Sequence, residues 1–335
     1  MIWRKPAAEA EGDTSAKRVL VIQLGGISTF VQALAAAKRI REEHIGARIT
    51  LLTTEATKEL AEKAPYFDAV EADGKPTEPQ AITNLIKRLR AAKYDVVYDL
   101  EGSSRTSNYF QGLRPWPPKW SGPTPGASYA FVDPDRVHMH PLDRLAAQLE
   151  KAGLGAQPLM PELGWLRTTM RDAPRLLPDY FGIRGPYVLL FPRGSDAESH
   201  RRWPEAKYIE LAKRIADNGV TPVVLGGTEE RPIGAAIAKA EPRAKNLVTR
   251  PDLFQCIALA ERASFAVGDD VELMHVAAAA GAPCLAFLSS TAKAAAPRGR
   301  SGVVEFTAAV IADLPVDQVD RQLRNCGVYR HAASA

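Results

Sequence analysis

Residues 18–26 read RVLVIQLGG, an apolar run that ends in two glycines. A run rich in Val, Leu and Ile predicts a strand that is buried on both faces, as strands of parallel sheets are. A helix is expected directly afterwards, over residues 28–43, because apolar side chains recur at helical spacing from Phe30 to Ile40. This order of strand, glycine turn and helix predicts an α/β fold with right-handed crossovers.

The same alternation continues along the chain and restarts near its middle. In the first half we expect strands and helices at residues 48–53, 56–64, 67–71, 78–92, 95–100 and 142–152. In the second half we expect them at residues 187–191, 204–217, 221–225, 231–240, 252–262, 264–267, 272–280, 284–288 and 316–324. The two series predict two Rossmann-like domains with doubly wound parallel sheets that face a central cleft.

Length and proline content set the predicted domain bounds. A chain of 335 residues suits two domains of about 150 residues each. Residues 112–134 are rich in proline and are expected to form a long irregular loop. The predicted parts are a flexible tail (1–17), an N-terminal domain (18–165), a linker (166–185), a C-terminal domain (186–312), and a last helix with a tail (313–335).

Composition narrows the class of protein. The net charge of +4 is weakly basic, which suits anionic small molecules, and no nucleic-acid partner is expected. The three cysteines lack metal-binding spacing, and Cys256 and Cys284 are expected to pack in the core, so no metal or cofactor is expected. No apolar run is long enough to span a membrane, and residues 1–17 do not resemble a signal peptide. We therefore expect a cytoplasmic protein.

Four loops follow predicted strands, where ligands of parallel sheets bind. They are LGGIST (24–29), LEGSSR (100–105), PRGSDAESHRRW (192–203) and GDDVELMH (268–275). Gly25 and Gly26 would let a ligand approach the backbone at a helix N-terminus. A tight strand-to-helix turn explains the two glycines equally well.

The second half offers two more sets of polar groups. Arg193 and the HRR run at 200–202 concentrate cationic side chains just before a helix, which favours anion binding over a solvated basic turn. Residues 226–230 read GGTEE and follow a strand. A glutamate of this run would suit ribose hydroxyls, or Thr228 would cap a helix whose first turn is acidic.

Seven segments occur in an order and spacing that together are fairly specific. They are RVLVIQLGG (18–26), YDVVYDLEG (94–102), HPLDRLAAQLEKAGL (140–154), FPRGS (191–195), RRWPEAKYIELAKRI (201–215), VVLGGTEER (223–231) and VGDDVELMHVAAAAGAPCLAFL (267–288). With these segments the chain resembles glycosyltransferase family 9, the ADP-heptose:lipopolysaccharide heptosyltransferase type, over residues 18–325.

The resemblance implies the GT-B fold and an inverting sugar transfer. The donor would be a nucleoside-diphosphate sugar, an ADP-sugar by the resemblance, held by the C-terminal domain. The acceptor would be a lipid-linked glycan such as lipopolysaccharide, held by the N-terminal domain. The protein would work in the cytoplasm, in peripheral contact with the cytosolic face of the inner membrane.

The resemblance also implies site residues. Arg201 stands where the family has a phosphate-binding lysine, and the family's ribose-contacting glutamate falls near Glu229 or Glu230. The full set of implied donor-binding residues is Ser195, Arg201, Arg202, Gly227, Thr228, Glu229, Glu230, Asp270 and His275. The implied acceptor-side residues are Gly25, Gly26 and Gln32.

The chain departs from the family at two important places. Thr29 stands where the family has the aspartate taken as the general base, and Gln32 stands where it has a histidine. Neither side chain has a pKa suited to accept a proton near neutral pH. In the donor loop, Val271 and Glu272 replace Ser-Gly, so Glu272 joins Asp269 and Asp270 at one helix start. Three carboxylates there would oppose a phosphate.

Glu101 and Asp99 are the candidates for a replacement base. Both lie at the end of a predicted buried strand and face the predicted cleft, and the family often has glutamine at the Glu101 position. The alternative is that Glu101 is an acid in the first turn of a helix.

Three functions follow. The first is a glycosyltransferase with a changed site. The second is a catalytically degenerate relative that serves as a binding or scaffold protein in envelope polysaccharide synthesis, and a third, weaker one is other nucleotide-sugar chemistry such as epimerisation. Basic residues on N-terminal helices would contact anionic lipid or form solvated helix faces. They are Arg39, Arg41, Lys87, Arg88 and Arg90.

Overall fold

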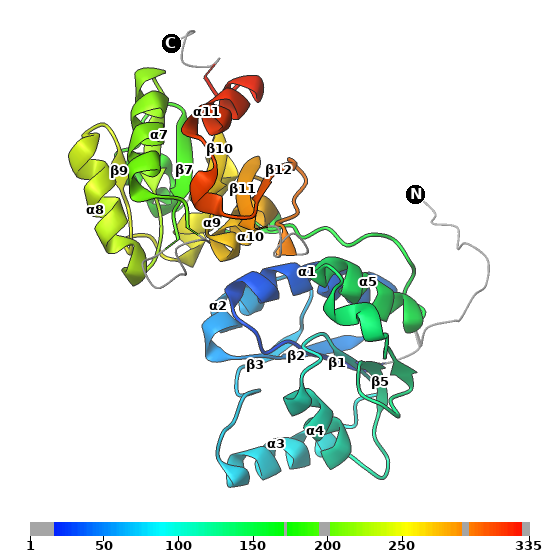
Figure 1. The fold of residues 1–335 in the computed structure, drawn as a ribbon. Helices are drawn as coiled ribbons and strands as arrows, with labels where there is room; N and C mark the ends of the chain where they lie inside the picture. Colours follow the sequence, from blue (N-terminus) through cyan, green and yellow to red (C-terminus); the bar gives the residue numbers. More distant parts are fainter. Residues whose placement is uncertain (1–16, 171–172, 194–201, 290–294, 330–335) are drawn as a thin grey trace, which may run out of the picture. The chain divides into compact units, whose positions relative to one another are not determined.

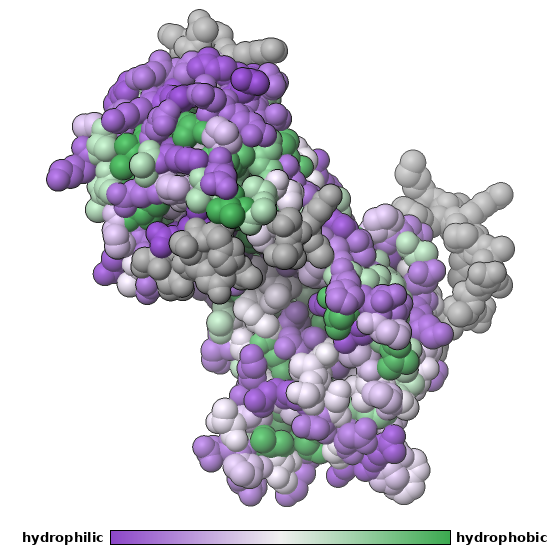
Figure 2. All heavy atoms as spheres, viewed as in Figure 1, coloured by the Kyte–Doolittle hydropathy of each residue, from purple (hydrophilic) through white to green (hydrophobic). Residues whose placement is uncertain are grey.

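The structure is a computed structural model that describes residues 17–170, 173–193, 202–289 and 295–329. The chain divides between Pro161 and Glu162 into two compact units, which we call the N-terminal and the C-terminal unit. On the face drawn in Figure 2, hydrophilic side chains cover much of each unit, and hydrophobic ones show as small separate groups. Within the described ranges, every helix is too short or too polar to cross a membrane.

The N-terminal unit is built on a six-stranded sheet with the order β3-β2-β1-β4-β5-β6, and all its strand pairings are parallel. Its strands are β1 (Arg18–Ile22), β2 (Arg48–Leu52), β3 (Ala69–Glu71), β4 (Val96–Asp99), β5 (Lys119–Gly122) and β6 (Tyr129–Ala130). Its helices are α1 (Ile27–Glu43), α2 (Glu55–Lys63), α3 (Pro79–Ala92), α4 (Ser104–Gly112), the 3-10 helix η1 (Pro134–Val137) and α5 (Pro141–Lys151).

Helices cover both faces of this sheet. Figure 1 shows α1, α2 and α5 on one face and α3 and α4 on the other. The core under α3 and α4 joins Leu85 and Leu89 to Leu20 and Ile22 of β1 and to Trp120 of β5. Because β1 is covered on both sides, its apolar residues are buried throughout, as the RVLVI run predicts.

The C-terminal unit repeats this plan with the strand order β12-β11-β10-β7-β8-β9, again parallel throughout. Its strands are β7 (Tyr187–Phe191), β8 (Thr221–Val224), β9 (Lys245–Asn246), β10 (Phe265–Gly268), β11 (Cys284–Ser289) and β12 (Val303–Ala308). Its α-helices are α6 (Trp165–Thr169), α7 (Glu205–Asp217), α8 (Arg231–Ala240), α9 (Leu253–Arg262), α10 (Val271–Ala280) and α11 (Val316–Asn325). Its 3-10 helices include η2 (Pro174–Leu176), η3 (Pro178–Phe181), η5 (Thr228–Glu230) and η7 (Ile311–Asp313). The predicted class, α/β with two doubly wound parallel sheets, is confirmed.

The prediction of an irregular loop over residues 112–134 is wrong, because this segment holds β5 and β6. β5 reads KWSG, and its Trp120 has no exposure to solvent and packs edge-on against Phe110 of α4, with ring centroids 5.4 Å apart. The prolines lie outside the two short strands, where they do not interrupt the ladder.

Residues 166–185, predicted as a linker, have secondary structure of their own. They hold most of α6 and all of η2 and η3. Arg167 pairs with Glu261 at 2.7 Å, and Arg175 pairs with Asp252 at 2.9 Å, so the segment is fastened to α9 and its N-cap. This segment packs as part of the C-terminal unit.

Candidate functional site

Each sheet has one place where the strand order reverses direction. In the N-terminal unit it lies between β1 and β4, where Ile22 pairs with Asp99. In the C-terminal unit it lies between β7 and β10, where Phe191 pairs with Gly268. Open parallel sheets bind ligands beyond the carboxyl ends of the strands at such a point. The predicted loops 24–29, 100–105 and 268–275 therefore begin at these two places.

The loop after β1 is held in a tight turn. Gln23 is buried, and its Oε1 accepts a hydrogen bond from the Gly25 amide at 2.6 Å. A β-carbon on Gly25 would lie 2.2 Å from Oγ1 of Thr29, so a larger residue would have to displace the Thr29 side chain. Thr29 is exposed and donates its hydroxyl to the Gly26 carbonyl at 2.9 Å. The tight-turn interpretation of the two glycines is thus sound, and the exposed Gly26 remains open to a ligand.

Gln32 lies on the buried side of α1. Its Nε2 donates to the Ser28 carbonyl at 3.2 Å, and its Oε1 is buried without a hydrogen-bond partner among the described residues. A side chain that is almost completely buried in its own unit is poorly placed to touch an acceptor. Gln32 is therefore the least accessible of the predicted acceptor-side residues.

Glu101 reaches from the end of β4 to the loop after β1. Its Oε2 accepts a hydrogen bond from the Leu24 amide at 3.1 Å, and the side chain is half-buried. Oε1 has no hydrogen bond to any described residue. Glu101 precedes the N-cap of α4, which is Ser103, so it is not a first-turn acid. The carboxylate thus fixes the glycine loop with one oxygen and leaves the other available.

Asp99 lies beneath Glu101 and has no exposure to solvent. Its Oδ1 accepts a hydrogen bond from the Gly102 amide at 2.9 Å, whereas Oδ2 is buried without a partner among the described residues. Burial raises the pKa of Asp99 to about 7, and the nearby charge of Glu101 adds to the rise. Asp99 is thus enclosed and contacts the turn that follows Glu101.

In the C-terminal unit, the buried Asp269 connects three segments. Its Oδ1 accepts hydrogen bonds from the Arg193 amide at 2.9 Å and from the Tyr208 hydroxyl at 2.6 Å. Its Oδ2 accepts a hydrogen bond from the Trp203 amide at 2.7 Å. From the sequence, Asp269 stands out only as one of three acids at the start of a predicted helix. Its anchoring role depends on contacts far apart in the sequence, which no local pattern reveals.

Asp270 and Glu272 begin α10. Asp270 is the N-cap, and its Oδ1 accepts hydrogen bonds from the amides of Glu272 at 3.0 Å and Leu273 at 3.3 Å. Burial raises the pKa of Asp270 to about 6, and the charges of Glu230 and Glu272 add to this, while Arg193 opposes it. Glu272 is exposed. The predicted crowding of carboxylates at this helix start is therefore present, with Glu230 as a further member.

The loop after β8 separates the two glutamates that sequence analysis left as alternatives. Glu230 is buried, and its Oε2 accepts a hydrogen bond from the Gly227 amide at 2.6 Å. Glu229 and Thr228 are exposed. The N-cap of η5 is Gly227, not Thr228. Glu229 is thus the exposed glutamate of the pair, and Glu230 is the buried one.

The remaining predicted donor residues differ in what the structure describes. Ser195 and Arg201 lie outside the described residues. Arg202 is half-buried beside the fully packed Trp203. His275 is buried in α10.

Most of the basic residues that sequence suggested for lipid contact bind other residues of the N-terminal unit. Arg39 donates to the Gly155 carbonyl, and Arg41 pairs with Asp68. Arg88 pairs with both Glu71 and Asp73, and Arg90 donates to the Gly112 carbonyl. These contacts favour a structural role over lipid binding.

Among the described residues, no three His, Cys, Asp or Glu side chains gather as a metal site would require.

A family model described as glycosyltransferase family 9 (heptosyltransferase) matches residues 82–301. Lipopolysaccharide heptosyltransferase 2 of Escherichia coli is 28% identical over 214 residues, which are 59% of this chain and 60% of that protein. Lipooligosaccharide heptosyltransferase 2 of Haemophilus influenzae is 28% identical over 109 residues, 31% of this chain and 32% of that protein. The matched region thus spans less than two thirds of either curated relative.

Solved structures share the fold over nearly the whole chain. A family 9 glycosyltransferase from Veillonella parvula has a TM-score of 0.76 at 16% identity, covering 92% of this chain and 97% of that one. The E. coli ADP-heptose lipopolysaccharide heptosyltransferase II has a TM-score of 0.73 at 18% identity, covering 92% and 98%. An E. coli heptosyltransferase solved with ADP also has a TM-score of 0.73, at 16% identity, covering 92% and 99%.

Proposed function

This chain belongs to glycosyltransferase family 9, the heptosyltransferase family, and from that premise we propose that it transfers a sugar from a nucleoside-diphosphate sugar to a glycan acceptor. The observation that carries the proposal is the position of the Glu101 carboxylate at the reversal point of the N-terminal sheet. Its Oε2 accepts a hydrogen bond from the Leu24 amide, and its Oε1 has no hydrogen bond to a described residue. It supplies the proton acceptor that Thr29 cannot.

Glu101 is the proposed general base. In an inverting transfer, a carboxylate accepts the proton of the acceptor hydroxyl, whose oxygen bonds to the anomeric carbon as the bond to the nucleoside diphosphate breaks. Oε2 is occupied by the Leu24 amide, so Oε1 would take the proton. Asp99 is a positioning residue in this scheme, because it holds the Gly102 amide from below.

The C-terminal unit is the proposed donor side. Exposed Glu229 would bind ribose hydroxyls, and Gly227 and Thr228 would line the same loop. Arg193 and Arg202 flank the segment that includes Ser195 and Arg201, and together they would neutralise the diphosphate. The heptosyltransferase solved with ADP makes an ADP-sugar the first donor to test.

The proposed acceptor is a lipid-linked glycan of the cell envelope, such as lipopolysaccharide, in line with the names of the curated relatives. Such an acceptor would bring the protein to the cytosolic face of the inner membrane. Gly25 and Gly26 would form the floor of the acceptor side, because Gly26 is exposed and nothing lies within 4 Å of where its β-carbon would be.

A second candidate function is a scaffold that binds envelope intermediates without catalysis. Two observations favour it. Thr29 replaces the expected base, and Glu272 places an exposed carboxylate beside Asp270 at the helix start where a diphosphate would bind.

Titration calorimetry with ADP, UDP and GDP, followed by a transfer assay with ADP-heptose and lipid-linked acceptor, separates the two. The enzyme is expected to bind ADP at micromolar concentration and to form product. Glu101→Gln should retain ADP binding and lose at least about 100-fold in turnover, the usual scale of general-base catalysis. Thr29→Ala is the matched control and should retain most activity. Equal turnover by Glu101→Gln and the native chain would refute the assignment of the base, and binding without turnover would favour the scaffold.

A further inference from the structure

Two arginines at the ligand-binding edge of the N-terminal sheet lack a counter-ion among the residues that the structure describes. Arg136 lies on η1 and Arg144 on α5, and both are half-buried. Neither guanidinium forms a hydrogen bond or ion pair with any residue in the described ranges, and Nε of Arg136 is buried without a partner. Arg88, in contrast, binds both Glu71 and Asp73.

The two guanidinium groups are close enough to repel each other. The pKa of Arg144 is lowered, first by burial and then by the charge of Arg136. Two partly desolvated cations whose charges interact are unfavourable in the free protein, and an anion bound by both would relieve the repulsion. The arrangement is typical of a binding site and costs stability when it is empty.

The pair lies next to the proposed base. Nη2 of Arg136 is 3.0 Å from where a β-carbon on Gly102 would be, and Gly102 directly follows Glu101. Gly102 has a positive φ of 60°, and its amide is held by Asp99. The turn that presents Glu101 therefore also forms one side of the space beside Arg136.

We propose that Arg136 and Arg144 form an oxyanion site that binds a phosphate or carboxylate group of the acceptor. Planar guanidinium groups bind both kinds of oxyanion through paired N–H donors. An acidic group held there would set which acceptor hydroxyl reaches Glu101. The assignment to the acceptor rests on the proposed function, whereas the existence of the anion site does not.

The test measures thermal unfolding of the full-length protein in sodium phosphate, in sodium glucuronate, and in sodium chloride of equal ionic strength. Arg136→Gln, Arg144→Gln and Arg144→Lys are compared with the native chain. Arg48→Gln is the matched control, because Arg48 is exposed at the start of β2, on the opposite edge of the same sheet. Titration with ADP is run on every variant.

In the native chain and in Arg48→Gln, phosphate or glucuronate should raise the midpoint of the transition by about 3 °C, as a ligand that binds only the folded state does. The shift should fall below a third of that in both glutamine variants and persist in part in Arg144→Lys. Without the anion, the glutamine variants should be as stable as the native chain or more stable, because a repulsion is gone. Lower stability of both glutamine variants in chloride, or equal anion shifts in all variants, would overturn the site.

The preferred anion and the ADP titration identify the ligand that supplies the oxyanion. A larger shift with phosphate indicates a phosphorylated acceptor, and a larger shift with glucuronate an acidic sugar. Unchanged ADP affinity in the glutamine variants supports the assignment of the bound anion to the acceptor. A tenfold loss of ADP affinity would assign the anion to the donor and overturn the assignment to the acceptor. If the native chain binds none of ADP, UDP and GDP, the proposed function fails, while the anion shifts still decide the site.

Discussion

Asp99 is a carboxylic acid that the N-terminal unit encloses completely, and its pKa of about 7 makes stability depend on pH. Between about pH 4 and pH 7 the folded state keeps a proton on Asp99 that the unfolded chain has lost. The free energy of unfolding should therefore fall as the pH rises through this range, with no further loss from Asp99 above it. A tenfold change in an ionisation constant corresponds to about 1.4 kcal/mol, so the total loss is a few kcal/mol.

Asp99→Asn should remove this part of the pH dependence, because asparagine resembles the protonated acid and can still accept from the Gly102 amide. Urea unfolding at pH 5, 6, 7 and 8, followed by hydrogen exchange of the β1 and β4 amides, measures the effect. Glu59→Gln, an exposed change in the same unit, serves as the control and should keep the native profile. A profile for Asp99→Asn as steep as that of the native chain would contradict the assignment.

Single residues also mark the limit of what sequence predicts about the site. Glu101 and Asp270 were identifiable because each follows a run that reads as a buried strand. The choice between Glu229 and Glu230 was not, since it depends on which side chain turns inward to the Gly227 amide. The Arg136–Arg144 pair joins two elements without a shared motif, so only the folded arrangement reveals it.

At the scale of elements, the strands and helices with strong periodicity were predictable. β7 and α8 begin and end at the predicted residues, because their apolar patterns are complete. α4 and β12 were missed for different reasons. α4 reads SRTSNYFQG, a sequence of weak helix propensity, and is stabilised by a capping box between Ser103 and Thr106. β12 reads VVEFTA, whose Val, Phe and Thr favour a strand, so this edge strand was predictable from its own sequence.

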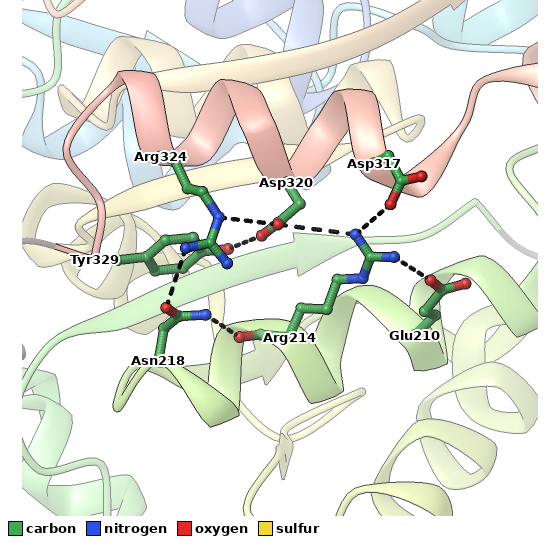
Figure 3. A network of polar contacts seen from close by, with 7 residues as sticks. All are labelled: Glu210, Arg214, Asn218, Asp317, Asp320, Arg324 and Tyr329. Carbon is green, nitrogen blue, oxygen red and sulfur yellow. Dashed lines mark hydrogen bonds and ion pairs between the residues drawn. The ribbon is translucent and has the colours of Figure 1, made fainter.

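The last helix, α11, is fastened to α7 by a polar network (Figure 3). Arg214 of α7 pairs with Glu210 of its own helix and with Asp317 of α11, at 2.5 and 2.7 Å. Asp320 of α11 is nearly buried and accepts hydrogen bonds from the Tyr329 hydroxyl at 2.8 Å and from Arg324 at 3.1 Å. Asp320 is thus the acceptor at the centre of the network.

Asp320→Ala should destabilise the C-terminal unit by about 2 kcal/mol, because the partly buried Tyr329 hydroxyl and the Arg324 guanidinium lose a buried, charged acceptor. Asp317→Ala is the matched control, since that side chain is 76% exposed and its ion pair with Arg214 is worth about 0.5 kcal/mol. Urea unfolding of both variants measures the difference. Equal losses, or a larger loss for Asp317→Ala, would mean that the network does not depend on Asp320.

At the scale of the whole molecule, the sequence predicts two parallel sheets. In the structure, each sheet lies in its own compact unit and has one point where the strand order reverses. The apolar runs sufficed for this, because a parallel strand buried on both faces is nearly continuous in hydrophobic residues. Each reversal point carries different chemistry. Glu101 and the arginine pair lie beside the N-terminal one, and the acids of α10 lie at the C-terminal one. The exposed Glu229 follows the neighbouring strand β8.

This division of chemistry predicts where a nucleotide protects the backbone. With ADP in excess, hydrogen exchange should slow in the C-terminal unit after β7, β8 and β10, at amides such as those of Arg193, Gly227 and Asp270. It should change little at Leu24 and Glu101. Adenosine, which lacks the phosphates, is the control and should protect less after β7, where Arg193 lies. Protection confined to the N-terminal unit would reverse the assignment of donor and acceptor sides, and with it the role of the Arg136–Arg144 site.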